Sequence, residues 1–171
     1  MIARVIERAC HLGARSAVLT FQPHPRQVLE AEPQGFLLTP LKEKVRILEE
    51  LGLELLVVLD FSAELARRPA RDFLAEVKDK LRLVELWCGP DFTLGRGREA
   101  DLTKLEAIGK ELGFRVYMAE PFSLRGQVVS STSVRRLLAE GKVQEAGELL
   151  GRRPSLNGLV TAGDSRGREL G

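Results

Sequence analysis

The chain has 171 residues, of which 44% are apolar and 29% are charged, a composition typical of a soluble globular protein with one main core. A net charge of +2 is too small to favour a nucleic acid or an anionic membrane as partner. The two cysteines exclude a disulfide framework, and no apolar run is long enough to span a bilayer. We therefore expect a cytoplasmic protein.

Helix and strand signals alternate along the chain. Apolar residues at helical spacing, with caps and terminating glycines, predict helices over residues 2–12, 40–51, 70–81, 102–112, 131–140 and 143–150. Short apolar runs between them predict strands over residues 16–21, 55–59, 84–88 and 115–118, followed by a hairpin-like return over 123–129. This alternation predicts an α/β fold whose parallel sheet has helices on both faces. Ligands of such sheets bind at the carboxyl ends of the strands.

The loop after the first predicted strand holds His24 between two prolines. Residues 20–25 have the sequence TFQPHP, so Pro23 and Pro25 fix the backbone in advance and lower the ordering cost of binding a ligand. The alternative interpretation is a rigid turn with a solvent-facing histidine. We treat His24 as a candidate binding residue and not as an acid or base.

The loop over residues 89–97 follows the third predicted strand and carries Asp91, Phe92 and Gly95. Its glycines fit either a ligand-binding loop or an ordinary connection between a strand and a helix. Because it follows a parallel strand, it is expected at the same edge of the sheet as the loop with His24.

A hydroxyl-rich turn runs into the predicted helix over 131–140. Ser130 or Ser131 can cap this helix, which leaves first-turn N–H groups at the positive end of the helix dipole. Arg135 lies one turn beyond Ser131, so its guanidinium can reach the same side as Thr132. Amides, hydroxyls and a guanidinium together describe a phosphate site, although an ordinary capped helix with a solvated arginine fits the same residues.

Five stretches of the chain together resemble one protein family. They read TFQPHP from residue 20, LTP from 38, GPDFTLG from 89, VSSTSVRR from 129 and LLGRRP from 149. Their order and spacing are similar to those of the bacterial FAD synthetases, which are bifunctional riboflavin kinase/FMN adenylyltransferases in the HIGH superfamily of nucleotidyltransferases. The resemblance implies a Rossmann-like nucleotidyltransferase fold with a parallel sheet and helices on both faces.

The resemblance also implies domain limits. Residues 1–151 correspond to an FMN adenylyltransferase domain without the GxFDGxHxGH segment and the first strand that carries it. Residues 152–171 correspond to the start of a riboflavin kinase domain. Neither His11 nor His24 replaces the two histidines of that segment by position, so we expect this polypeptide alone to be inactive.

The implied activity is transfer of AMP from ATP to FMN, giving FAD and pyrophosphate, with Mg²⁺ arriving with ATP and riboflavin as a further ligand of the bifunctional protein. Arg135 is the implied catalytic residue. The implied ATP-binding residues are Ser130, Ser131, Thr132 and Arg135. The implied flavin and nucleotide pocket is formed by Pro23, His24, Pro25, Asp91, Phe92 and Gly95, and no protein metal ligand is expected. Leu94 and Ala100 depart from the family pattern, which usually has Phe and Gly there.

Three alternatives stay open. The chain could be a non-catalytic nucleotide- or flavin-binding module, another nucleotidyltransferase of the same superfamily, or a gene fragment that does not fold alone. Its oligomeric state and its affinity for flavin are not predicted by the sequence.

Overall fold

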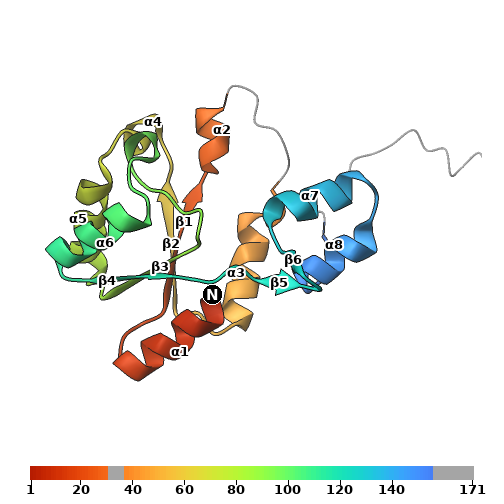
Figure 1. Ribbon diagram of the computed structural model, residues 1–171, viewed down its shortest axis with the longest axis horizontal. Helices are drawn as coiled ribbons and strands as arrows, with labels where there is room; N and C mark the ends of the chain where they lie inside the picture. Colours follow the sequence, from red (N-terminus) through yellow and green to blue (C-terminus); the bar gives the residue numbers. More distant parts are fainter. Residues whose placement is uncertain (31–36, 156–171) are drawn as a thin grey trace, which may run out of the picture. The chain divides into compact units, whose positions relative to one another are not determined.

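The computed structural model describes residues 1–30 and 37–155 (Figure 1). The chain forms two compact units, unit 1 over residues 1–129 and unit 2 from Ser130 onward. The expected start of a further domain over residues 152–171 falls mostly outside the described residues. The domain limits at 151 and 152 therefore stay a prediction.

Unit 1 alternates helices and strands, as predicted. Apolar stripes, and glycines such as Gly13 and Gly113 with positive φ at helix ends, set most of the element bounds. In chain order, unit 1 contains α1 (Ile2–Leu12), β1 (Ala17–Gln22), α2 (Pro25–Leu29), α3 (Leu41–Glu50), β2 (Leu55–Asp60), α4 (Ala63–Ala66), α5 (Ala70–Leu81), β3 (Glu85–Cys88), the 3-10 helix η1 (Arg96–Arg98), α6 (Leu102–Leu112), β4 (Arg115–Met118), β5 (Ser123–Leu124) and β6 (Gln127–Val128).

The strands confirm the predicted α/β class. β1 pairs with β2 in parallel, with Ala17 opposite Leu55 and Gln22 opposite Asp60. β3 pairs with β4 in parallel, and β5 with β6 forms the predicted antiparallel hairpin. Among the described residues, no ladder joins β1 to β3. The parallel strands therefore form two separate pairs.

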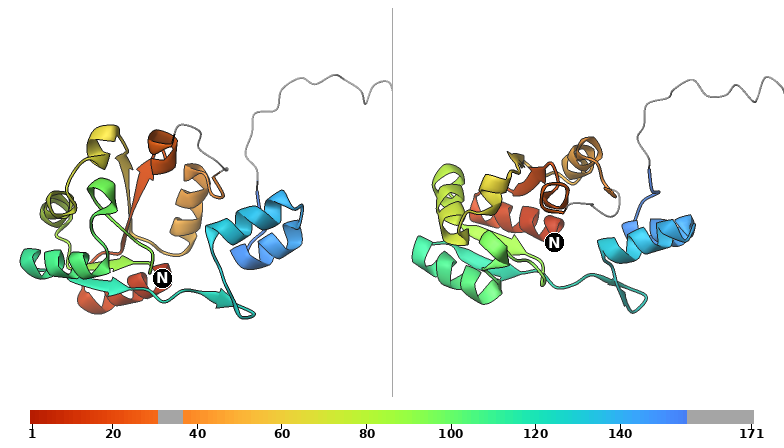
Figure 2. Two further views of the ribbon diagram at one scale, coloured as in Figure 1. Left: turned by 45° about the horizontal axis from the view of Figure 1, so that its top comes forward. Right: turned by 90° about the horizontal axis from the view of Figure 1, so that it is seen from above.

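One face of these strands, the packed face, carries the main core. Side chains of Leu19, Phe21 and Leu59, together with Leu86 and Val116, pack under α5 and α6. The buried residues of this core are Ala70, Phe73, Leu74, Ala100, Leu105, Ile108 and Phe114. Figures 1 and 2 show α5 and α6 side by side. Apolar burial of this kind is the main source of stability in a domain.

The opposite face, the polar face, is linked to α1 and α3 by side-chain hydrogen bonds. Because strand side chains alternate, Thr20 and Glu85 point to this face. Arg8 of α1 donates from Nη2 to Glu85 Oε1 at 2.9 Å, and Lys44 of α3 donates from Nζ to Thr20 Oγ1 at 2.8 Å. α1 and α3 have one buried residue each, Ala9 and Leu48, so apolar burial contributes less here than on the packed face.

Two stacked aromatic rings lie beside the contact between Arg8 and Glu85. The ring centroids of Trp87 and Tyr117 are 4.9 Å apart, and Trp87 Nε1 donates to Glu85 Oε2 at 3.4 Å. An arginine, a carboxylate and two rings thus attach α1 to the β3–β4 pair.

Unit 2 contains α7 (Ser131–Ala139) and α8 (Val143–Leu150). Val134, Leu137 and Ala146 are its buried apolar side chains. Gly141, between the helices, has φ 74°, the left-handed conformation that a glycine after a helix adopts without strain. The two predicted helices are therefore confirmed, with α7 one residue shorter than expected.

Two short helices differ from the prediction. The sequence predicts a loop after β1, but Pro25–Leu29 forms α2, and Ala63–Ala66 forms α4. Helices of four or five residues bury too little surface to leave a periodic pattern and depend on their caps. α3 begins one residue later than expected, with Pro40 as its N-cap.

Candidate functional site

The predicted pocket residues in unit 1 lie at the carboxyl ends of the parallel strands. β1 ends at Gln22 and continues through Pro23 into α2, and β2 ends at Asp60 before α4. The two ends are joined, because the N–H of Phe61 donates to the carbonyl of Gln22 at 3.1 Å. The Phe61 ring also meets the Phe21 ring edge-on, with centroids 5.3 Å apart. This edge of the sheet is where ligands of parallel α/β folds bind.

His24 caps α2. Its Nδ1 accepts a hydrogen bond from the N–H of Arg26 at 3.2 Å, and its own N–H donates to Gln27 Oε1 at 2.9 Å. This is the reciprocal pattern of a capping box. Because Nδ1 accepts, the neutral ring carries its proton at Nε2. His24 therefore has a structural role that the sequence did not reveal, and Pro23 and Pro25 hold it on either side.

The loop that contains Gly95 is closed on itself and attached to α5. Leu94 and Ala100 exchange two backbone hydrogen bonds of 3.0 Å each, and Ala100 is fully buried. Gly95 has φ 83°, and a Cβ built there would lie 2.6 Å from the backbone N of Ala70. That same N–H donates to Glu99 Oε1 at 2.9 Å. Gly95 is thus required for the close approach of loop and helix, whatever it does in binding.

Asp91 and Phe92 stand before this closed loop in a turn, where the N–H of Phe92 donates to the carbonyl of Gly89 at 3.2 Å. Both side chains are exposed, Phe92 to 39%. An exposed phenyl ring beside a carboxylate can receive a flat aromatic ligand. The structure therefore leaves these two side chains accessible, whereas Gly95 lies against Ala70 of α5.

In unit 2, the predicted phosphate-binding residues lie in the first turns of α7. Ser130 is the N-cap: its Oγ accepts from the N–H of Ser133 at 3.1 Å, and Ser133 Oγ accepts from the N–H of Ser130 at 3.1 Å. Ser131 and Thr132 are exposed in the first turn, and Arg135 is half-buried. Residues four apart on a helix share a face, so Ser131 and Arg135 lie on one side of α7.

At the start of α7, some polar groups hold the helix cap and others are exposed. The Ser130 hydroxyl is engaged in the cap, so of the two serines that could cap the helix, Ser130 does so. The hydroxyls of Ser131 and Thr132 and the first-turn N–H groups stand at the positive end of the helix dipole, where an anion is stabilised. The pocket residues of unit 1 and the α7 residues belong to different units, and each set is assembled within its own unit.

No group of metal ligands is present among residues 1–30 and 37–155. A magnesium ion that keeps its waters and binds mainly to substrate phosphates does not need such a group. Neither cysteine is placed as a nucleophile: Cys10 is exposed on α1, and burial raises the pKa of the Cys88 thiol.

A cavity of about 230 Å³ opens elsewhere, between the packed face and α5. It is lined by apolar residues such as Leu19, Val57 and Val77, with Asp60 and Lys80 among its charged residues. None of the predicted site residues lines it. The cavity therefore adds no support to the predicted pocket.

Sequence reasoning missed Ser133, Glu99 and Lys44. Ser133 completes the cap of α7, and Glu99 caps α5 from the loop after β3. The spacing of Ser130 and Ser133 was a usable signal, since a capping box pairs the N-cap residue with the residue three positions later. The contacts of Glu99 and Lys44 join segments far apart in sequence and leave no local pattern.

An α/β unit with parallel strand pairs and candidate ligand residues at their carboxyl ends defines a Rossmann-like α/β protein. Comparison with family models makes the assignment more specific, because the model described as FAD synthetase matches residues 1–133. The chain belongs to the FAD synthetase family.

Curated relatives extend the similarity to most of the chain. The chain is 35% identical over 155 residues to the bifunctional riboflavin kinase/FMN adenylyltransferase of Escherichia coli K12. This match covers 90% of this chain and 50% of that protein. The proteins of the same name from Listeria monocytogenes and Bacillus subtilis are 33% and 34% identical over 162 residues, covering 93% of this chain and 51% and 50% of theirs. The chain thus spans about half the length of the curated relatives it matches.

A solved structure shows the same fold. The crystal structure titled macrolide-efflux protein from Streptococcus pneumoniae matches with a TM-score of 0.84 and 30% identity, covering 99% of this chain and 55% of that one. The word efflux in that title describes the streptococcal protein and not this chain. In the described part of the chain, every helix is too short or too polar to cross a membrane.

Proposed function

We propose that the protein represented by this chain transfers AMP from ATP to FMN, giving FAD and pyrophosphate. The observation that carries the proposal is the family match over residues 1–133. The printed names of the relatives support it. In this proposal FMN and FAD are substrate and product, Mg²⁺ accompanies ATP, and riboflavin is a ligand of the longer bifunctional protein in the cytoplasm.

The proposed triphosphate contacts come from α7. Ser131 and Thr132 offer hydroxyls beside the first-turn N–H groups, and Arg135 offers a planar fork that suits phosphate oxygens. Charge that develops on the α-phosphate and on the leaving pyrophosphate is stabilised by such fixed donors without reorganisation. Ser130 contributes through the cap that holds this turn.

The proposed flavin and nucleotide pocket lies in unit 1. Phe92 and Asp91 are the exposed groups that can contact a ring and its polar edge. Pro23, His24, Pro25 and Gly95 shape the backbone around them, since His24 caps α2 and Gly95 allows the loop to approach α5.

The chain taken alone is proposed to bind these ligands without turnover. It contains two histidines, of which His11 is exposed on α1 and His24 caps α2. Neither is placed as the pair of imidazoles that the family resemblance requires for adenylyl transfer. Binding without turnover is also what the non-catalytic binding module predicts, so binding and chemistry have to be measured separately.

The test is calorimetric titration of the purified chain with ATP·Mg²⁺ and with FMN, together with an assay of FAD formation. Arg135→Ala should lower the affinity for ATP about tenfold or more, the loss expected for a hydrogen bond to a charged group. The matched control is Arg136→Ala, because Arg136 is exposed on the same helix and pairs with Glu140 at 3.6 Å.

The outcomes separate the alternatives. Arg135-dependent ATP binding with no FAD formed supports a formed phosphate site in a chain without turnover. FAD formation by the pure chain contradicts the proposed lack of turnover and supports the transferase directly. A cooperatively folded chain that binds neither ligand contradicts the proposal. Binding of a nucleotide but not of FMN favours another nucleotidyltransferase of the superfamily.

A further inference from the structure

Lys44 is a half-buried cation with an unusual set of partners. Its Nζ donates to Thr20 Oγ1 at 2.8 Å, and among residues 1–30 and 37–155 it forms no ion pair with a carboxylate. Burial lowers the pKa of Lys44, because desolvation disfavours the charged form and no carboxylate opposes it. A half-buried charge without a counter-charge leaves its desolvation cost uncompensated.

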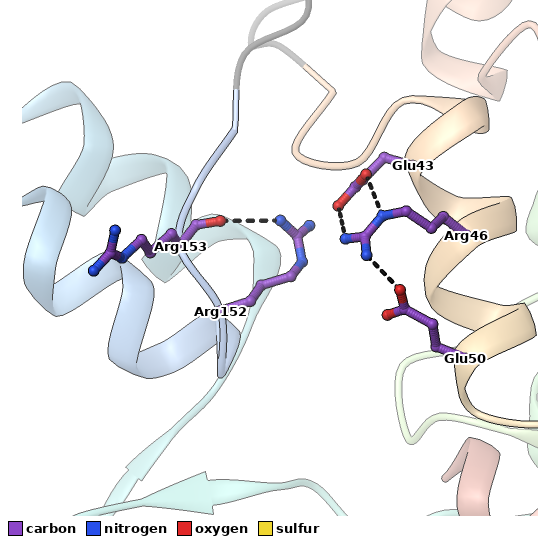
Figure 3. A network of polar contacts seen from close by, with 5 residues as sticks. All are labelled: Glu43, Arg46, Glu50, Arg152 and Arg153. Atoms are coloured by element: carbon purple, nitrogen blue, oxygen red, sulfur yellow. Dashed lines mark hydrogen bonds and ion pairs between the residues drawn. The ribbon is translucent and has the colours of Figure 1, made fainter.

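Other cations of α1 and α3 show the contrast. Two positions further along α3, Arg46 is held by Glu43 and Glu50 (Figure 3). The hydrogen bonds to Glu43 raise the pKa of Arg46. Arg8 on α1 has Glu85. Lys44 thus differs from its neighbours in having a neutral hydroxyl where they have carboxylates.

The position of Lys44 explains where an anion could meet it. Thr20 lies opposite Val58 in the β1–β2 ladder, two residues before the end of β1. Lys44 belongs to the first turn of α3, where its N–H donates to the carbonyl of Pro40 at 2.9 Å. An ammonium group has three donors, and Thr20 takes one of them. The remaining donors stand near the carboxyl end of β1, the edge that also carries His24.

We propose that Lys44, oriented by Thr20, binds a phosphate group of the ligand at the carboxyl edge of β1. This inference rests on the proposed function, which supplies two phosphorylated ligands, FMN and ATP. Both present the same chemistry to Lys44, a phosphate oxygen that accepts a charge-assisted hydrogen bond. Such an anion would supply the counter-charge that the described residues do not.

The experiment compares each phosphorylated ligand with its unphosphorylated form. The affinities of the full chain for FMN, riboflavin, ATP·Mg²⁺ and adenosine are measured for wild type, Lys44→Met and Lys42→Met. Methionine keeps the length of the side chain and removes the charge. Lys42 is the matched control because it is exposed on the same helix.

Lys44→Met is expected to lose about tenfold in affinity for one phosphorylated ligand, the size of loss that removal of a hydrogen bond to a charged group produces. Its affinity for the unphosphorylated form of that ligand should not change. Loss for FMN alone assigns Lys44 to the phosphomonoester, and loss for ATP alone assigns it to the triphosphate. Lys42→Met should change none of the four affinities.

Two results overturn the inference. The first is a wild-type chain that binds the ligands and a Lys44→Met variant that loses affinity equally for phosphorylated and unphosphorylated forms, or loses none. Lys44 would then be a structural residue. Binding of none of the ligands by wild type would overturn the proposed function together with this inference. If Lys44→Met does not fold, Lys44→Gln retains a donor for Thr20 without the charge and is judged by the same ratios.

Stability gives an independent readout. Because the Lys44 charge is half-buried and lacks a carboxylate, its removal should leave the melting temperature unchanged or raise it. A variant that binds phosphate less well but is no less stable than wild type shows that the lysine serves binding. A fall in melting temperature with unchanged phosphate selectivity would contradict this.

Discussion

The two faces of unit 1 are held by different forces. On the packed face, α5 and α6 bury a continuous apolar core around Leu74 and Leu105. On the polar face, α1 and α3 bury one residue each, and Glu85 and Thr20 connect them to the strands. Apolar contacts depend little on pH, whereas polar contacts depend on the charge of each partner. Unit 1 should therefore owe its stability to the packed face and its response to pH and anions to the polar face.

The largest expected effect is on the packed face. Leu105 on α6 has 0% exposure, so Leu105→Ala should lower the free energy of unfolding by about 2–5 kcal/mol through lost burial and the resulting cavity. The matched control is Leu12→Ala on α1, where the leucine is 44% exposed and the loss should be far smaller. Urea unfolding of both variants is the measurement. Similar losses would contradict the proposed difference between the faces.

The next largest loss of stability is expected where the loop after β3 is attached to α5. Gly95→Ala should cost about 1–3 kcal/mol, because the new methyl group overlaps the backbone of Ala70 and must push loop and helix apart. Gly97→Ala is the control: Gly97 also has a positive φ, 62°, but a Cβ there meets nothing within 4 Å. Thermal unfolding should separate the two variants. Equal destabilisation would mean that positive φ alone sets the cost.

Just before the first residues of β1 and β2, Glu54 satisfies a buried backbone group. The N–H of Ser16, a residue with 1% exposure, donates to Glu54 Oε2 at 2.8 Å. Glu54→Ala should cost about 1–2 kcal/mol, because it leaves that N–H without its acceptor. Glu54→Gln retains an acceptor and should recover most of the loss, while Glu49→Ala, at an exposed site on α3, should cost little. Failure of Gln to recover stability would contradict the hydrogen-bond explanation.

The packed face was more predictable from sequence than the polar face. Apolar periodicity gives the bounds of α5 and, with Asp101 and Gly113, those of α6, because burial repeats with the turn of the helix. The contact between Arg8 and Glu85 joins residues 77 positions apart, so no local pattern reports it. The short helices α2 and α4 were missed for a different reason, since helices of four or five residues leave no apolar periodicity.

The candidate site divides in the same way. The cap of α7 follows from local spacing, so the sequence could place Ser130, Ser131 and Arg135 on one helix start. The role of Gly95 against Ala70, and that of Lys44 beside Thr20, depend on segments that meet only in the folded chain. Motif resemblance therefore selected the candidate loops, while the structure was needed to separate side chains that hold a loop in place from side chains that stay exposed.

The smallest expected effect is a pH dependence on the polar face. Hydrogen bonds from Arg8 hold the pKa of Glu85 below its usual 4.5, although burial acts in the opposite direction. A lowered carboxylate pKa contributes stability that is present above pH 4.5 and is lost as the pH falls through the lower, folded-state value. Arg8→Met removes the cation and leaves the Glu85 side chain, 7% exposed, with its burial cost.

The variant should therefore be less stable than wild type at neutral pH, and the difference in melting temperature should shrink as the pH falls below 4.5. The measurement is thermal unfolding followed by circular dichroism across that range, with Arg4→Met, at an exposed site on α1, as control. A difference that stays constant with pH would mean that Arg8 stabilises α1 by packing of its apolar stem. The polar face would then resemble the packed face more closely than its hydrogen bonds indicate.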